Sequence, residues 1–216
     1  MHKTHPLTIS ITSYARGGKN TFAHVLADYL RSLKLAPAFY SFAEELKKEC
    51  AVEIANNYGL DSFSELTEEK DIFRNVLVSR AKQLRDKTKG NYFVKLIEEE
   101  IGFDWMDFDF RTNFIPIITD FRFAEYYELG NDELNFALKN GFIIHLEREG
   151  GKAANETELF NNDKISKIAP LFLDKYVKFN FPDCGNDIPK LKSLMVAAIQ
   201  SSEIKQLITK NSNILL

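Results

Sequence analysis

The stretch that decides the fold is residues 13–21, which read Ser-Tyr-Ala-Arg-Gly-Gly-Lys-Asn-Thr. The apolar run 7–12 precedes it and predicts a strand, while Phe22, Val25 and Leu26 begin an apolar series at helical spacing after it. A strand that enters a helix through a glycine-bearing turn leaves several amide N–H groups pointing at one place, with the positive end of the helix dipole behind them. The pattern therefore predicts a phosphate-binding turn.

The turn agrees only in part with the P-loop template G-x-x-x-x-G-K-[ST]. Gly18 and Lys19 match, whereas Ser13 stands in the first glycine position and Asn20 in the hydroxyl position. A glycine-rich turn with an incidental lysine is the alternative, but the flanking strand and helix favour phosphate binding, because two adjacent glycines let the backbone wrap phosphate oxygens. Lys19 would then reach the β- and γ-phosphates, and Asn20 or Thr21 would make the magnesium contact.

The composition is typical of a globular protein with one domain. The 216 residues are 44% hydrophobic and 27% charged, which suffices for one good core and is short for two. The formal charge of −3 makes a nucleic-acid polymer an electrostatically unfavoured partner. The two cysteines lack metal-ligand spacing, and Cys50 falls in a helical pattern that predicts a small buried hydrophobe.

The N-terminal apolar run is too short for a signal peptide, and no stretch of the sequence is long enough and apolar enough to span a bilayer. We therefore expect a cytoplasmic, reducing setting and no membrane partner.

Beyond the turn, apolar periodicity predicts alternating strands and helices. Further strands are expected at 37–41, 114–119, 142–146 and 175–181, and helices at 18–33, 42–57, 67–87, 91–101, 126–139 and 187–199. The helix at 126–139 is expected to be interrupted near Gly130 and to end at Gly141 in a left-handed cap. The tail 201–216 is expected to continue as a weak helix or to fray.

His145 and the run 104–110 resemble parts of functional sites, but their sequence context favours a structural role for each. His145 lies in an apolar strand, where a lone histidine is more often packed than catalytic. The acidic and aromatic run 104–110 lacks the glycine and terminal glutamate of a calcium loop, and it favours an amphipathic connection.

Basic residues concentrate on the helix at 67–87, at Arg74, Arg80, Lys82 and Arg85. Their spacing fits two interpretations, a solvated basic face and a clamp for an anionic acceptor. The sequence leaves both open.

A carboxylate and an arginine follow the central apolar run 114–119. Asp120 comes at the carboxyl end of this expected strand, where open α/β sheets place their ligands, and there it can hold Mg²⁺ directly or through water. Arg122 would face phosphate. The alternative is that Asp120 merely caps the next helix.

Glycines and charges without an apolar face occupy the stretch from Glu149 to Lys164. Glu149, Gly150, Gly151 and Lys152 lie at its start, directly after Arg148. Such a segment is the best candidate for a lid that closes over a ligand, and a plain loop is the alternative.

Taken in order, these motifs resemble the phage-type deoxynucleoside monophosphate kinases, within the P-loop nucleotide kinase superfamily. Residues 15–21 resemble that family's A-R-S-G-K-D-T loop, in which the position after lysine is also not a hydroxyl. The other stretches that carry the resemblance are 41–47, 74–85 with 91–94, Ile118-Thr119-Asp120-Phe121-Arg122-Phe123 with Glu125, 144–148, and 155–159 as a poor copy of an H-x-S-E segment. The departures are Ser13 for glycine and Asn20 for aspartate.

The resemblance implies one three-layer α/β domain over residues 1–216, with a five-stranded parallel sheet in the order 2-3-1-4-5. It implies an acceptor-binding helical region at about 42–103 and a lid at about 149–164. The implied activity is Mg²⁺-dependent transfer of the γ-phosphoryl group of ATP to a nucleoside monophosphate, preferably a deoxy one. The oligomeric state is left open, with a homodimer as one option.

The resemblance and the spacing together imply a role for each candidate residue. The catalytic candidates are Lys19, Arg16 and Arg122. The candidates for binding ATP are Ala15, Arg16, Gly17, Gly18, Lys19, Asn20, Thr21, Arg148 and Lys152. The candidates for binding the acceptor are Lys47, Arg74, Arg80, Arg85 and Arg122, and those for binding the metal are Asp120, Asn20 and Thr21.

Two alternatives remain for the function. One keeps the phosphotransfer and changes the acceptor to another phosphorylated small molecule, such as phosphomevalonate or dephospho-coenzyme A. The other is a degenerate nucleotide-binding protein that transfers no phosphate, which Ser13 and Asn20 suggest because both depart from the template.

Overall fold

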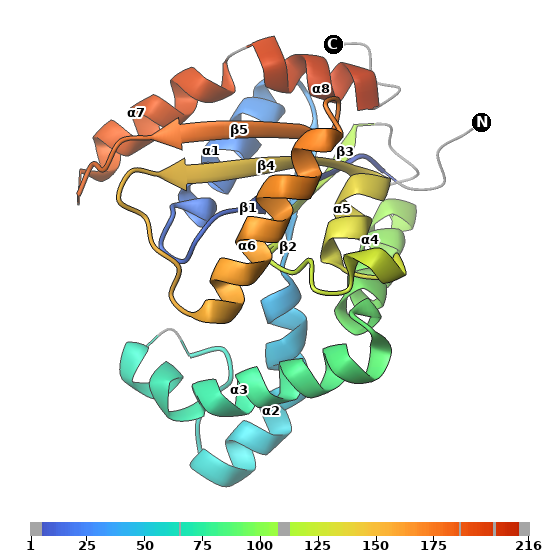
Figure 1. The fold of residues 1–216 in the computed structure, drawn as a ribbon, viewed down its shortest axis with the longest axis vertical. Helices are drawn as coiled ribbons and strands as arrows, with labels where there is room; N and C mark the ends of the chain where they lie inside the picture. Colours follow the sequence, from blue (N-terminus) through green and yellow to red (C-terminus); the bar gives the residue numbers. More distant parts are fainter. Residues whose placement is uncertain (1–5, 65, 108–112, 186, 201, 212–216) are drawn as a thin grey trace.

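The computed structural model describes residues 6–64, 66–107, 113–185, 187–200 and 202–211. Their centre is one parallel five-stranded sheet (Figure 1). Its strands are β1 (Thr8–Thr12), β2 (Ala36–Tyr40), β3 (Phe114–Ile118), β4 (Gly141–Arg148) and β5 (Tyr176–Phe181). The strand order is β2-β3-β1-β4-β5, which confirms the predicted order.

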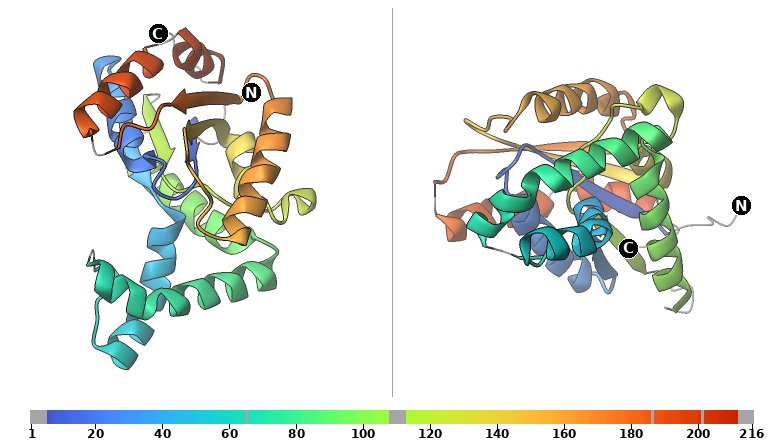
Figure 2. Two further views of the ribbon diagram at one scale, coloured as in Figure 1. Left: turned by 60° about the vertical axis from the view of Figure 1, so that its left-hand side comes forward. Right: turned by 90° about the horizontal axis from the view of Figure 1, so that it is seen from below.

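Helices cover both faces of the sheet, so that the molecule has three layers (Figure 2). One face carries α1 (Lys19–Ser32), α7 (Ile188–Ile199) and α8 (Ser202–Asn211), and the other carries α4 (Asn91–Asp107), α5 (Glu133–Asn140) and α6 (Glu156–Ile168). Each layer closes its own apolar core, and both cores share the strands between them. Among the described residues, no helix combines the length and apolar character needed to cross a membrane.

The side chains of β1 alternate between the two faces of the sheet. Ile9 and Ile11 are fully buried in the core beneath α1, whereas Thr8, Ser10 and Thr12 alternate with them and face the other layer. Thr12 pairs in register with His145 of β4, which is buried and bonded through Nδ1 to the hydroxyl of Tyr176 at 2.9 Å. Burial lowers the pKa of His145 to about 4, in agreement with the predicted packing role.

Two helices project from the carboxyl edge of the sheet (Figures 1 and 2). They are α2 (Phe42–Tyr58) and α3 (Thr67–Thr88), and they enclose a small separate core of Cys50, Ile54 and Phe73. Cys50 is 1% exposed, as predicted for a small hydrophobe. The expected acceptor region therefore consists of this α2–α3 hairpin together with α4, which returns to pack on the sheet.

The chain departs from the sequence prediction after β3. In place of one helix at 126–139, it forms a 3₁₀ turn (Tyr127–Leu129) and then α5, and Asp132 starts α5 with a capping box to Asn135. Gly130, left-handed at φ 76°, separates the two. Helix α4 also runs on to Asp107, past the predicted end at 101, while residues 108–110 of the acidic and aromatic run lie outside the described residues, as do 212–216 of the tail.

The prediction of a left-handed cap at Gly141 is wrong. Its φ of −173° is extended backbone, and the residue is the first of β4, opposite Thr8 of β1. A glycine is needed there because a Cβ atom would lie 1.6 Å from the carbonyl oxygen of Thr8. Close approach between two central strands is therefore the physical reason for this glycine.

Replacing Gly141 with alanine is expected to lower the free energy of unfolding by about 3 kcal/mol, because β1 and β4 must move apart to admit the methyl group. Urea denaturation measures the change. The matched control is Gly102→Ala in α4, where nothing lies within 4 Å of the added Cβ, and where alanine should stabilise the helix by about 0.5–1 kcal/mol. Equal stability of the two variants would contradict the close approach.

Candidate functional site

The loop between β1 and α1 is tightly wound. Gly18 is left-handed at φ 85° and Arg16 at φ 60°, and the amide of Gly17 donates to the carbonyl oxygen of Tyr14 at 3.0 Å. A Cβ atom on Gly17 would lie 2.4 Å from Oγ of Ser13. The serine that departs from the template is thus accommodated by the glycine opposite it.

Lys19 folds back into this loop. Its Nζ donates to the carbonyl oxygen of Ser13 at 2.8 Å, to Oγ of Ser13 at 3.2 Å and to the carbonyl oxygen of Tyr14 at 3.1 Å. Because an ammonium group has three donors, the loop satisfies all of them. The residue is 7% exposed, and burial together with the nearby charge of Arg122 lowers its pKa to about 8.

Charges from two other segments act on Lys19. Arg122 and Asp120 follow β3, and Glu158 lies on the first turn of α6, and all three act on the pKa of Lys19. The two carboxylates raise this pKa and oppose the effects of burial and Arg122. The structure therefore brings together three residues predicted from sequence, Lys19, Asp120 and Arg122. It adds Glu158, which lies in the poorly matching segment 155–159 and was not among the predicted site residues.

Asp120 joins the end of β3 to the start of α2. Its Oδ1 accepts from the amide of Phe42 at 2.9 Å, and its Oδ2 accepts from the amide of Ala43 at 2.7 Å and the hydroxyl of Ser41 at 3.0 Å. The carboxylate thus caps a helix, but not the one that the alternative from the sequence named. The capped helix is α2, which precedes Asp120 in the sequence, and not the next helix along the chain.

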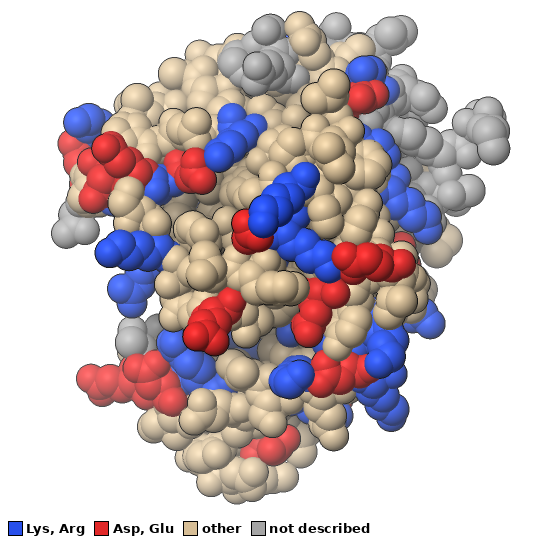
Figure 3. Space-filling model, viewed as in Figure 1, with Lys and Arg blue, Asp and Glu red and all other residues tan. Residues whose placement is uncertain are grey.

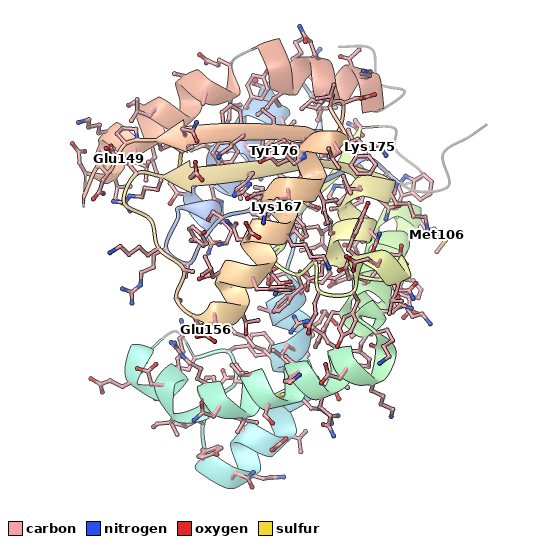
Figure 4. The ribbon with its side chains drawn as sticks, in the orientation of Figure 1. Met106, Glu149, Glu156, Lys167, Lys175 and Tyr176 are labelled. Atoms are coloured by element: carbon pink, nitrogen blue, oxygen red, sulfur yellow. The ribbon has the colours of Figure 1, made fainter. Side chains whose placement is uncertain are left out.

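A cavity of about 330 Å³ lies beside the loop. Five of the residues predicted to bind ATP line it, namely Ala15, Arg16, Gly17, Arg148 and Lys152. Its opposite wall is the connection between β4 and α6, whose two ends are marked by Glu149 and Glu156 in Figure 4. Arg148 is held at the wall by an ion pair with Asp183 and by the carbonyl oxygen of Gly185 at 3.1 Å.

The other predicted ATP and metal residues lie on or next to the first turn of α1. Gly18 is the N-cap residue, Asn20 is exposed and Thr21 is half-buried. The expected lid at 149–164 is divided, because α6 begins at Glu156 and buries Asn161 and Asn162. Only residues 149–155 form a connection without helix or strand.

Arg85 is buried in the protein interior next to the strand end. Its guanidinium lies 3.5 Å from the ring centroid of Phe123 and 3.4 Å from Oε1 of Glu133. Glu133 also accepts the backbone amides of Arg122 at 3.0 Å and Phe123 at 3.1 Å. Burial raises the pKa of Glu133 to about 7 and lowers that of Arg85. Arg85 thus supports the backbone that carries Arg122.

The remaining acceptor candidates lie on the α2–α3 hairpin. Arg74 pairs with Asp71 at 3.1 Å, and Arg80 pairs with Glu49 at 2.6 Å. Nζ of Lys47 lies 5.5 Å from the ring centroid of Phe63. On the face of the molecule in Figure 3, basic and acidic side chains are interspersed, so the basic residues there do not form one continuous patch.

Comparison with known proteins does not identify a family for this chain. No protein family model and no curated protein matches the sequence. Shikimate kinase from Acinetobacter baumannii in complex with shikimate aligns with 92% of this chain and 96% of its own, at 13% identity and a TM-score of 0.37. The crystal structure of APE1195 aligns with 92% of this chain and 97% of its own, at 12% identity and a TM-score of 0.36. At these values neither alignment supports an argument about activity.

Lys19 is expected to titrate near pH 8 in the ligand-free protein, which NMR of ¹³C-labelled lysine side chains can measure. Arg122→Ala should raise the pKa of Lys19, because a neighbouring positive charge is lost, and Glu158→Gln should lower it, because a neighbouring negative charge is lost. Glu156→Gln is the control, since Glu156 is exposed and is not among the charges that act on Lys19. If the pKa of Lys19 were the same in all three variants, the predicted effect of Arg122 and Glu158 on Lys19 would be wrong.

Arg85→Met is expected to lower the free energy of unfolding by about 3 kcal/mol, because it leaves Glu133 buried without its cation. Arg74→Met should change it by less than about 0.5 kcal/mol, because its pair with Asp71 is exposed. Thermal or urea denaturation of both variants tests the contrast. If Arg85→Met were as stable as the unaltered protein, the supporting role of Arg85 would be wrong.

Proposed function

We propose that the protein is a P-loop kinase that transfers the γ-phosphoryl group of ATP to the phosphate of a nucleoside monophosphate, preferably a deoxynucleotide. The observation that carries the proposal is the meeting of Lys19, Asp120 and Arg122 at the carboxyl edge of the sheet. A lysine, a carboxylate and an arginine around a glycine loop are the groups that phosphoryl transfer needs, because the reaction depends on positioning and charge neutralisation.

ATP would bind with its phosphates on the loop and the rest of the nucleotide toward the cavity beside it. Loop amides and Lys19 would hold the β- and γ-phosphates after Lys19 exchanges its contacts with Ser13 and Tyr14 for phosphate oxygens. Arg16, Arg148 and Lys152 line the cavity and supply positive charge along the nucleotide. Arg148 is already held in place by Asp183, so its guanidinium needs little reordering.

Mg²⁺ would be held by Asp120 together with Asn20 or Thr21. A carboxylate has about four lone-pair sites, and three of those on Asp120 already accept hydrogen bonds from α2. Asp120 therefore suits contact through a metal-bound water better than direct ligation, and Mg²⁺ commonly keeps several waters. The ion would neutralise phosphate charge, while Asn20 and Thr21 on the first turn of α1 would orient it.

The acceptor phosphate would lie between Arg122 and the α2–α3 hairpin. Arg122 is close enough to Lys19 to lower its pKa, so an anion beside both would be neutralised by each. Arg74, Arg80 and Lys47 lie farther out on the hairpin, where they would meet the acceptor as it arrives. Arg85 becomes a positioning residue, because it holds Glu133, which in turn binds the backbone amide of Arg122.

The second candidate function is a nucleotide-binding protein without turnover. One observation favours it: the loop satisfies all three donors of Lys19 internally, and α2 occupies both oxygens of Asp120. A protein that kept these contacts with ATP bound would not align the phosphates for transfer. A kinase for another phosphorylated acceptor would use the same donor site and would differ at the hairpin.

The deciding experiment measures ADP formation from Mg-ATP with the four deoxynucleoside monophosphates, AMP, GMP, phosphomevalonate and dephospho-coenzyme A. Turnover on at least one deoxynucleotide is expected, and Lys19→Ala should lower kcat/KM by about 100-fold or more. The control is Lys167→Ala, because Lys167 pairs with Asp163 on the exposed side of α6 and should leave turnover unchanged. Turnover only on a non-nucleotide would change the acceptor, and ATP binding without turnover on any acceptor would favour the second candidate.

A further inference from the structure

The carboxylate of Glu158 lies on the phosphate loop. Its Oε1 accepts the backbone N–H of Ala15 at 2.7 Å, although the two residues are 143 positions apart in the sequence. Its Oε2 accepts the N–H of Ala154 at 2.6 Å. The amide of Glu158 donates to the N-cap side chain of Asn155 at 2.9 Å, which fixes the first turn of α6 and with it the position of the carboxylate.

The contact with Ala15 places an anion of the protein itself on an amide of the anion-binding loop. A carboxylate oxygen and a phosphate oxygen both accept hydrogen bonds from such amides, so they compete for the same donor. The charge of Glu158 also acts on Lys19, the second phosphate-binding group of the loop. In the structure, Ala15 is bonded to Glu158 and Lys19 to the loop carbonyls.

The contact with Ala154 reaches the connection 149–155, which contributes Glu149, Gly150, Gly151 and Lys152 to the lining of the cavity. One carboxylate therefore binds two segments that line the cavity, the loop through Ala15 and the connection through Ala154. Loss of either hydrogen bond would free the connection from the loop.

We propose that Glu158 is an internal gate of the nucleotide site, an inference that rests on the proposed function. Its carboxylate occupies the Ala15 amide until a polyphosphate displaces it, and the displacement releases the connection 149–155 from the loop. A ligand without phosphate cannot displace the carboxylate, so the gate selects for polyphosphates. The gate lowers the affinity for nucleotide, because part of the binding free energy is used to break the contacts of Glu158.

The test compares Glu158→Gln, Glu158→Asp and the control Glu156→Gln, which removes a charge from the same helical turn without touching the loop. Isothermal titration calorimetry gives the Kd for Mg-ATP, for inorganic tripolyphosphate and for adenosine. Glu158→Gln should tighten binding of ATP and of tripolyphosphate by about tenfold and leave adenosine unchanged, whereas Glu156→Gln should stay within about twofold. Glu158→Asp keeps the charge but is too short to bind both amides, so it should also tighten binding.

Hydrogen exchange of the ligand-free proteins provides the second readout. The amides of Ala15 and Ala154 should exchange faster in both Glu158 variants and at the original rate in Glu156→Gln. Unchanged or weaker nucleotide affinity in the two Glu158 variants, or unchanged exchange at both amides, would overturn the gate and leave the proposed function standing. Absence of nucleotide binding in every variant and in the unaltered protein would overturn the proposed function and the gate with it.

Discussion

The carboxyl edge of the sheet concentrates hydrogen-bond donors that must be satisfied, and this requirement shapes the rest of the site. Parallel strands end here together, so the loop after β1, the first turn of α2 and the segment after β3 present amides to one region. In the structure, a carboxylate of the chain accepts hydrogen bonds from the amides of each segment. Glu158 binds the amide of Ala15, Asp120 binds those of Phe42 and Ala43, and Glu133 binds those of Arg122 and Phe123. Buried amides left without acceptors would each destabilise the fold by about 1–3 kcal/mol.

These acceptors also connect parts of the molecule that have different tasks. Asp120 joins the central strand to the α2–α3 hairpin, Glu133 joins Arg85 of α3 to the backbone of Arg122, and Glu158 joins the phosphate loop to the connection before α6. A ligand that changes one of these bonds therefore also changes the restraint on a helix or a loop. Three carboxylates thus connect the α2–α3 hairpin and the connection 149–155 to the segments that follow β1 and β3.

The sequence was sufficient for the fold because local pattern and topology agree. The buried strands and the amphipathic α1 follow from apolar periodicity, and the sheet order followed from the resemblance. The interactions that could not be predicted join residues far apart in the chain, such as Glu158 with Ala15 or Asp120 with Phe42. Neither Glu158 nor Asp120 lies in a pattern that names its partner. Arg85 resembles its exposed neighbours until Phe123 and Glu133 are placed around it.

The pair formed by Ser13 and Gly17 has a consequence for tracing relatives of this protein. The serine hydroxyl occupies the space where a side chain at 17 would begin, so the two positions restrict each other's size. A larger residue at 17 is excluded while serine stands at 13, and the carbonyl oxygen of Tyr14, 2.9 Å from the same Cβ position, restricts position 17 further. Relatives with serine at 13 are therefore expected to keep glycine at 17, and a search that requires the first glycine of the P-loop would overlook them.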